Sequence, residues 1–155
     1  MCPLCSESTL GISLDKARGD PTLSRGVDSE KWDDKRRGST VSDLARRSPE
    51  IATRIFDLIE AIVDQAVDHL EHGRLTELGD LMNFNHGALS ALGVVSSENE
   101  KMVALARDAG ALGAKVTGAG FGGAMIALAP GRGEQVQAAL RKHGFPALLN
   151  QIKNH

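Results

Sequence analysis

The fold is decided by the stretch Ala114-Lys115-Val116-Thr117-Gly118-Ala119-Gly120-Phe121-Gly122-Gly123-Ala124-Met125-Ile126-Ala127-Leu128. The runs at 114–117 and 124–128 predict two short strands, and the second run is apolar throughout, which is typical of a strand inside a sheet. The glycines between the runs let the backbone turn and can bring several amide groups together around an anion. No Gly-Lys-Ser/Thr follows them, and a strand rather than a helix comes next, so the pattern is neither a P-loop nor a dinucleotide-binding fingerprint. The segment is either a plain turn between strands or a phosphate-binding loop.

Helical patterns lie on both sides of these strands. Apolar residues from Ile51 to Leu70 recur mostly at spacings of three and four, and the preceding Ser48-Pro49-Glu50 is a favourable helix start. Further helices are predicted over the approximate ranges 75–92 and 96–108, and a final helix follows the turn at 130–133 and ends near Arg141 and Lys142. The short link at Gly73-Arg74 predicts that the first two helices are antiparallel neighbours.

Two weaker signals concern the ends of this region. Thr40 followed by Asp43 resembles a capping box, so a short helix is expected to begin at 39–40. Residues 145–149 could form a last strand, in which Pro146 favours an edge position because it has no amide hydrogen to donate.

The N-terminal residues 1–38 are rich in polar side chains and show no helical or alternating apolar pattern. We therefore expect an irregular or disordered segment there, followed by one domain at 39–155. The pair Cys2 and Cys5 provides half of a zinc site, without the second cysteine pair or the nearby histidine pair that a structural site needs. These two cysteines are predicted to be inert.

Composition limits the class of protein. The chain has 155 residues, Lys+Arg 18 against Asp+Glu 20, a net charge of −2 and 41% hydrophobic residues, as in one soluble globular domain. The balanced charge does not produce the positive field that a nucleic-acid interface needs. No stretch approaches the length of a membrane span or resembles a secretory signal, so the expected location is the cytoplasm.

Three histidines could have chemical roles. His86 follows two asparagines on a predicted helix, and we interpret it as a hydrogen-bonding residue rather than a catalytic one. His69 and His72 are spaced as two metal ligands on one helix could be, but the acidic residues around them favour an exposed helix end.

Two longer stretches resemble the C-terminal half of the mevalonate kinases. They are Leu81-Met82-Asn83-Phe84-Asn85-His86-Gly87-Ala88-Leu89-Ser90-Ala91-Leu92-Gly93-Val94 and Ala111–Ala124. Mevalonate kinases form a group with galactokinase, homoserine kinase and phosphomevalonate kinase, and their third motif has the form Lys-Leu-Thr-Gly-Ala-Gly-Gly-Gly-Gly-Cys. Residues 115–124 depart from it by Val116, Phe121 and Ala124. Galactokinases also tend to have Phe at the position of Phe121, so the first stretch is what favours mevalonate kinase.

The resemblance covers about residues 36–143, beginning at Arg36-Arg37-Gly38-Ser39-Thr40. It implies an α+β fold, with a ferredoxin-like antiparallel sheet, helices packed on one face and an antiparallel helix pair. It also implies that ATP phosphates bind at Thr117, Gly118, Ala119, Gly120, Phe121, Gly122 and Gly123, with Mg²⁺ and mevalonate, a small alcohol, as the other participants. In the family, the ATP-cradling motif, the Mg²⁺ contacts and the catalytic aspartate belong to an N-terminal domain that no part of this sequence matches. No catalytic or metal-binding residue is therefore assigned, and the chain alone is expected to be inactive.

The missing domain leaves three functional hypotheses open. In the first, the chain is half of a mevalonate kinase that works as part of a full-length enzyme or of a complex with a separate N-terminal kinase domain. In the second, it is a non-catalytic oligomerisation or regulatory domain. In the third, it belongs to a galactokinase-like or other small-alcohol kinase. A surface left bare by the missing domain predicts self-association, with a homodimer as the expected state.

Overall fold

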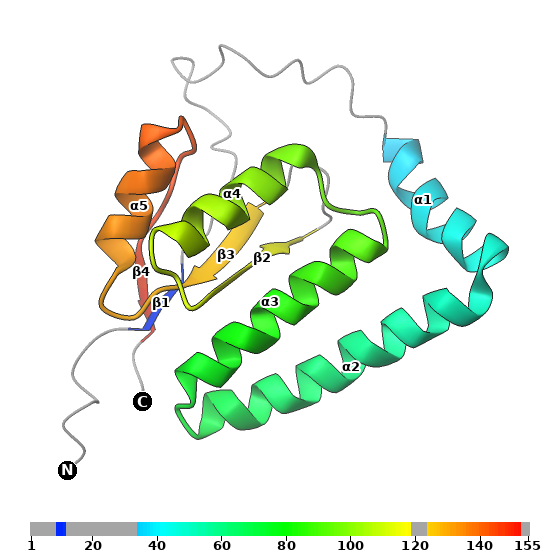
Figure 1. Ribbon diagram of the computed structural model, residues 1–155, viewed down its shortest axis with the longest axis horizontal. Coiled ribbons are helices and arrows are strands. Elements are labelled where there is room, and N and C mark those ends of the chain that lie inside the picture. Colours follow the sequence, from blue (N-terminus) through cyan, green and yellow to red (C-terminus); the bar gives the residue numbers. More distant parts are fainter. Residues whose placement is uncertain (1–8, 12–33, 119–123, 153–155) are drawn as a thin grey trace.

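The computed structural model describes residues 9–11, 34–118 and 124–152 (Figure 1). Its elements follow in the order β1 (Thr9–Gly11), α1 (Asp34–Arg47), α2 (Pro49–Glu71), α3 (Leu75–Ala91), α4 (Ser97–Asp108), β2 (Gly113–Thr117), β3 (Ala124–Leu128), α5 (Gly133–Lys142) and β4 (Asn150–Ile152). The strands form one sheet, and the helices are not regularly interleaved with parallel strands. The predicted α+β class is confirmed.

The sheet has the strand order β2-β3-β1-β4, and its described pairings are antiparallel. β3 therefore lies inside the sheet, as its apolar sequence predicts. The β2–β3 pairing runs from Gly113 opposite Leu128 to Thr117 opposite Ala124. This order, with α5 between β3 and β4, is the ferredoxin-like arrangement that the sequence analysis anticipates.

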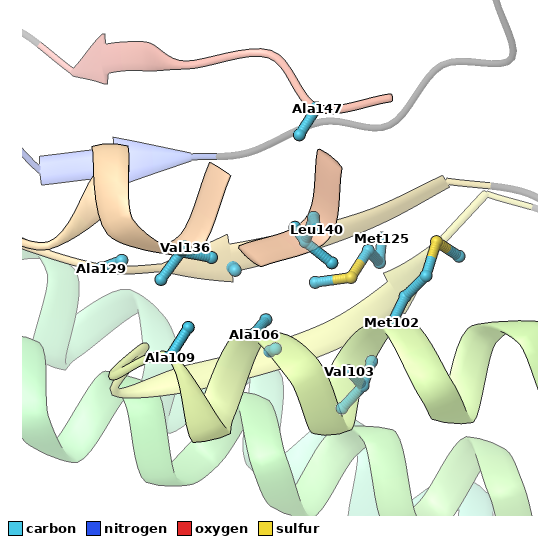
Figure 2. Close-up of a cluster of buried hydrophobic side chains, with 11 residues drawn as sticks. Met102, Val103, Ala106, Ala109, Met125, Ala129, Val136, Leu140 and Ala147 are labelled. Atoms are coloured by element: carbon cyan, nitrogen blue, oxygen red, sulfur yellow. The ribbon is translucent and has the colours of Figure 1, made fainter. Parts of the chain in front are cut away.

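One face of the sheet is covered by α4 and α5. Ala114 pairs with Ala127 and Val116 pairs with Met125, so these four buried side chains share a face. Figure 2 shows α4 and α5 packing their apolar sides against this region. The main buried cluster consists of small aliphatic residues and two methionines: Met102, Val103, Ala106, Ala109, Ala114, Met125, Ala127, Ala129, Val136, Leu140 and Ala147.

The antiparallel helix pair predicted from the Gly73-Arg74 link is formed by α2 and α3. Gly73 has φ +66°, which glycine adopts without strain, and the chain reverses there. α3 contacts β2, and α2 packs on the side of α3 that is away from the sheet (Figure 1). The order of layers is therefore sheet, α3 and α2.

Two expectations for the N-terminal part differ from the structure. α1 begins at Asp34, so Thr40 and Asp43 lie inside the helix and do not form a capping box at its start. The charged residues before Ser39 include lysine and arginine, which favour helix continuation. β1 is a strand within the segment predicted to be irregular. Residues 1–8 and 12–33, with Cys2 and Cys5, lie outside the described residues, so the domain division at residue 38 stays a prediction.

The last strand is also displaced from its predicted position. It comprises Asn150–Ile152 rather than residues 145–149, although β4 does occupy an edge of the sheet. Ala147 is buried instead against α5, where its carbonyl oxygen accepts hydrogen bonds from Gln137 Nε2 and Arg141 Nη2, each at 2.9 Å. These bonds hold the segment to the helix. Pro146 also has no amide hydrogen to donate to a neighbouring strand, so the chain joins the sheet only from Asn150 onward.

Candidate functional site

The described ends of the glycine segment lie at one end of the sheet. Thr117, the last residue of β2, pairs with Ala124, the first residue of β3, so the residues between them join two neighbouring antiparallel strands. Gly118 is exposed and has φ +76°, a left-handed conformation that glycine adopts readily. The other predicted site residues, Ala119, Gly120, Phe121, Gly122 and Gly123, lie outside the described residues. Phosphate binding at the segment stays a prediction.

Lys115 is a cation beside this segment that the sequence analysis does not select. It precedes Thr117 by two residues and lies on the same face of β2, because alternate residues of a strand share a face. Its side chain is half-buried, and its Nζ donates a hydrogen bond to the carbonyl oxygen of Val116 at 2.9 Å. Burial lowers the pKa of Lys115, since a cation is less stable away from water. One lysine in an otherwise apolar strand was the signal available in the sequence.

The first half of α4 lies at the same end of the sheet. In Figure 2, Met102 of α4 lies near Met125, the second residue of β3. Ser96 caps the helix, because its hydroxyl accepts a hydrogen bond from the Asn99 amide at 3.2 Å. The peptide dipoles of α4 leave a partial positive charge at this end. Glu98 and Glu100 in the first turn offset this dipole, so Lys115 rather than α4 adds positive charge near the strand ends that flank the glycine segment.

The outer edge of β2 is held by side chains from α3 and α4. The Asn83 side chain donates from Nδ2 to the carbonyl oxygen of Leu112 and accepts at Oδ1 from the Ala114 amide, both at 3.1 Å. Arg107 Nη2 donates to the carbonyl oxygen of Ala114 at 2.9 Å. These bonds satisfy backbone groups that an additional strand would otherwise bind. β2, which leads into the glycine segment, is thus fixed on both edges.

His86 joins α3 to α4. Its Nε2 lies 3.1 Å from Glu100 Oε2, and Ser90 Oγ donates to Glu100 Oε1 at 2.8 Å. The hydrogen bond from Ser90, followed by the one with His86, lowers the pKa of Glu100, because both favour the ionised carboxylate. His86 is buried between the helices, a position that suits the hydrogen-bonding interpretation of this residue.

The histidines at the end of α2 lie beside the carboxylate of Asp68. Asp68 forms an ion pair with Arg74, and its carboxylate oxygens lie 3.1 Å from His72 Nδ1 and 3.9 Å from His69 Nδ1. No group of three His, Cys, Asp or Glu side chains placed to hold a metal ion occurs in residues 9–11, 34–118 and 124–152. The same described residues contain no helix that is long and apolar enough to cross a membrane.

Comparison with known families identifies the family of the chain. The family model described as "GHMP kinases C terminal" matches residues 58–145, more than half of the chain. The chain belongs to the GHMP kinases. The matched range of this GHMP kinase chain includes β2, β3 and the glycine segment between them.

Curated relatives of this GHMP kinase chain are mevalonate kinases. That of Pyrococcus horikoshii is 43% identical over 109 residues, and that of Methanothermobacter thermautotrophicus is 44% identical over 103 residues. These alignments cover 67% and 66% of this chain, but 32% and 34% of the relatives. The chain therefore spans about one third of the length of the curated relatives that it matches.

Solved structures with the same fold include mevalonate kinases. L. major mevalonate kinase in complex with R-mevalonate has a TM-score of 0.72 at 24% identity, and the match covers 97% of this chain and 44% of that one. The Methanococcus jannaschii mevalonate kinase has a TM-score of 0.67 at 21% identity, with 97% and 41% coverage. At these identities the likeness establishes the fold and not the substrate.

Proposed function

We propose that this chain provides the nucleotide-phosphate side of a mevalonate kinase active site, with ATP as the nucleotide. The proposed contacts are Thr117, Gly118, Ala119, Gly120, Phe121, Gly122 and Gly123. The observation that supports this most is the position of the glycine segment, which joins the adjacent ends of β2 and β3 within the range that the family model matches. Backbone amides at such a turn can bind phosphate oxygens without help from side chains.

Lys115 has a role in this proposal as the cation beside the phosphates. Its burial disfavours the charged ammonium, and a nearby phosphate would stabilise that charge. Phosphoryl transfer depends mainly on positioning and on neutralising the charge of the phosphates. A lysine near backbone amides that bind phosphate would therefore add charge neutralisation to such a site.

Mg²⁺ does not fit the described part of this chain. The ion prefers carboxylate, phosphate and water oxygens in a regular octahedron, and no suitable cluster occurs among the described side chains. We assign the metal ligands, the catalytic base and part of the mevalonate cleft to a separate N-terminal kinase domain. The chain alone is expected to bind nucleotide weakly and to phosphorylate nothing. We also propose a cytoplasmic location and self-association as a homodimer.

Titration calorimetry with Mg·ATP, with and without mevalonate, tests this proposal together with a coupled ADP-release assay. The expected result is binding without turnover. Turnover by the chain alone would contradict the assignment of the catalytic groups to another domain. Absence of nucleotide binding would instead favour the non-catalytic oligomerisation or regulatory function, and a reconstituted complex that prefers galactose would favour a galactokinase-like one.

A matched pair of variants tests the role of Lys115. Lys115→Met should weaken Mg·ATP binding by about tenfold, because it removes a charge near the phosphates. Lys142→Met removes an exposed charge at the end of α5 and should leave binding unchanged. Equal effects of the two variants would mean that Lys115 affects binding only through the net charge of the protein.

A further inference from the structure

The outer side of α2 presents a row of exposed apolar side chains. Phe56, Val63, Val67 and Leu70 are 46%, 52%, 52% and 54% exposed. They follow one another at intervals of seven, four and three residues, which places them along one side of the helix. We call these four residues the α2 strip.

The neighbouring elements leave the α2 strip uncovered. The buried residues of α2 include Ala52 and Ile62, and α2 contacts α1 and α3. Figure 1 shows α2 as the outermost layer, with α3 between it and the sheet. The α2 strip adjoins the packed side of α2 and continues the apolar surface of the helix beyond what the described residues bury. Single exposed apolar residues are common on proteins, whereas a continuous row indicates an interaction surface.

Acidic side chains border the α2 strip. Asp57, Glu60, Asp64 and Glu71 follow the next row of the helix at intervals of three, four and seven residues. Within the described part of the chain none of these four carboxylates forms an ion pair, in contrast to Asp68, which pairs with Arg74. α2 as a whole contains six acidic residues and one arginine. The surface is therefore apolar along its centre and negative along its border.

We propose that the α2 strip binds an apolar surface of another protein that is bordered by lysine and arginine side chains. The apolar centre would provide affinity, and opposite charges at the border would favour this partner over others. A second copy of this chain fits less well, because its identical patch has an acidic row and lacks the basic border that would complement it. The homodimer proposed above would accordingly use a different surface. This inference does not depend on nucleotide binding.

Two synthetic helical peptides test the proposal by fluorescence anisotropy. Both have the same leucine face, which is bordered by lysines in one peptide and by glutamates in the other. The chain should bind the lysine-bordered peptide at least about tenfold more tightly, and added salt should reduce that difference. Equal binding of the two peptides, or binding of neither, would overturn the proposal.

Variants on and off the α2 strip separate specific docking from general stickiness. The double variant Val63→Ser with Val67→Ser should weaken binding of the lysine-bordered peptide by about tenfold. Leu148→Ser, which removes a side chain of similar exposure far from α2, should change it by less than about twofold. Circular dichroism confirms that each variant is folded. Unchanged peptide binding by the double variant would overturn the proposal. Sedimentation velocity gives a second test. If the wild-type chain is a dimer and the double variant is a monomer, a second copy occupies the α2 strip and the proposal is overturned.

Discussion

Gly79 in α3 and Gly113 in β2 touch through their backbones. A Cβ atom added to Gly113 would overlap the carbonyl oxygen of Gly79, and one added to Gly79 would lie 2.7 Å from Cβ of Leu112. Helix and strand can approach this closely because neither residue has a side chain. The approach also brings Asn83, one turn further along α3, within hydrogen-bonding distance of β2.

Gly113→Ala should lower the free energy of unfolding by about 2 kcal/mol or more, because helix and strand must move apart to admit the methyl group. Urea denaturation followed by circular dichroism measures the change. Gly87→Ala on the same helix is the matched control, since a Cβ there meets nothing within 4 Å. That control should raise stability by about 0.5 to 1 kcal/mol, as alanine does in a helix interior. Equal effects of the two variants would contradict the role of the close contact.

Asn83→Leu should lower the free energy of unfolding by about 2 kcal/mol, because it leaves the Ala114 amide and the Leu112 carbonyl without their partner. Hydrogen exchange gives a local measurement. The Ala114 amide should exchange faster in the variant, whereas the Leu112 amide, which donates to the Leu128 carbonyl oxygen at 2.8 Å, should stay protected. An unchanged Ala114 rate would mean that the side-chain bond does not protect this edge.

Asn99→Leu should raise the free energy of unfolding by about 1 to 2 kcal/mol. Asn99 is 0% exposed, and among the residues that the structure describes neither its Oδ1 nor its Nδ2 has a hydrogen-bond partner. Leucine, which branches at the same atom, therefore removes a desolvation cost. The bond from the Asn99 amide to Ser96 is kept, because it uses the backbone. Asn99→Asp is the opposite test and should destabilise the fold strongly at neutral pH, since it buries an unpaired charge. If both variants lower the free energy of unfolding equally, the shape of the space around Asn99 rather than its polarity determines which residue fits there.

Glu100→Gln should lower stability at neutral pH by less than about 1 kcal/mol, since Glu100 is largely exposed and solvent screens its interactions. The folded-state pKa of Glu100 is lowered from 4.5 by Ser90 and His86, so the wild-type advantage is fully present above pH 4.5. It should disappear as the pH falls through the lowered pKa, because the carboxylate becomes protonated in both folded and unfolded states. Thermal denaturation of both proteins across this range measures the difference. If the stability difference between the two proteins persists at acidic pH, it is caused by packing rather than by the charge of Glu100.

Elements with strong local signals were predicted well from the sequence. Proline at the start of α2, the serine cap of α4 and the apolar run of β3 each depend on a few neighbouring residues. β1 could not be predicted in this way, because its three residues pair with β3 and β4 from the far end of the chain. The displaced β4 has a similar cause, since the burial of Ala147 against α5 is a tertiary effect.

The same distinction between local and tertiary information applies to the candidate site. Thr117 and Gly118 were recognisable because glycines follow a strand pattern, which is local information. The half-burial of Lys115 depends on which face of β2 is covered, and the edge contacts of Asn83 depend on how α3 meets that strand. Helical periodicity places Gly79 and Asn83 on one side of α3 but does not say what lies opposite.

The pairing of β1 with β4 places Leu10 opposite Gln151. During translation β1 is made before either of its partner strands exists, and residues 12–149 must follow before it can pair with β4. The helices of 34–108 and the β2–β3 hairpin need no such delay, since their contacts are closer in sequence. Translation should therefore produce a helical body first, and the sheet can be completed only when residues 150–152 have left the exit tunnel.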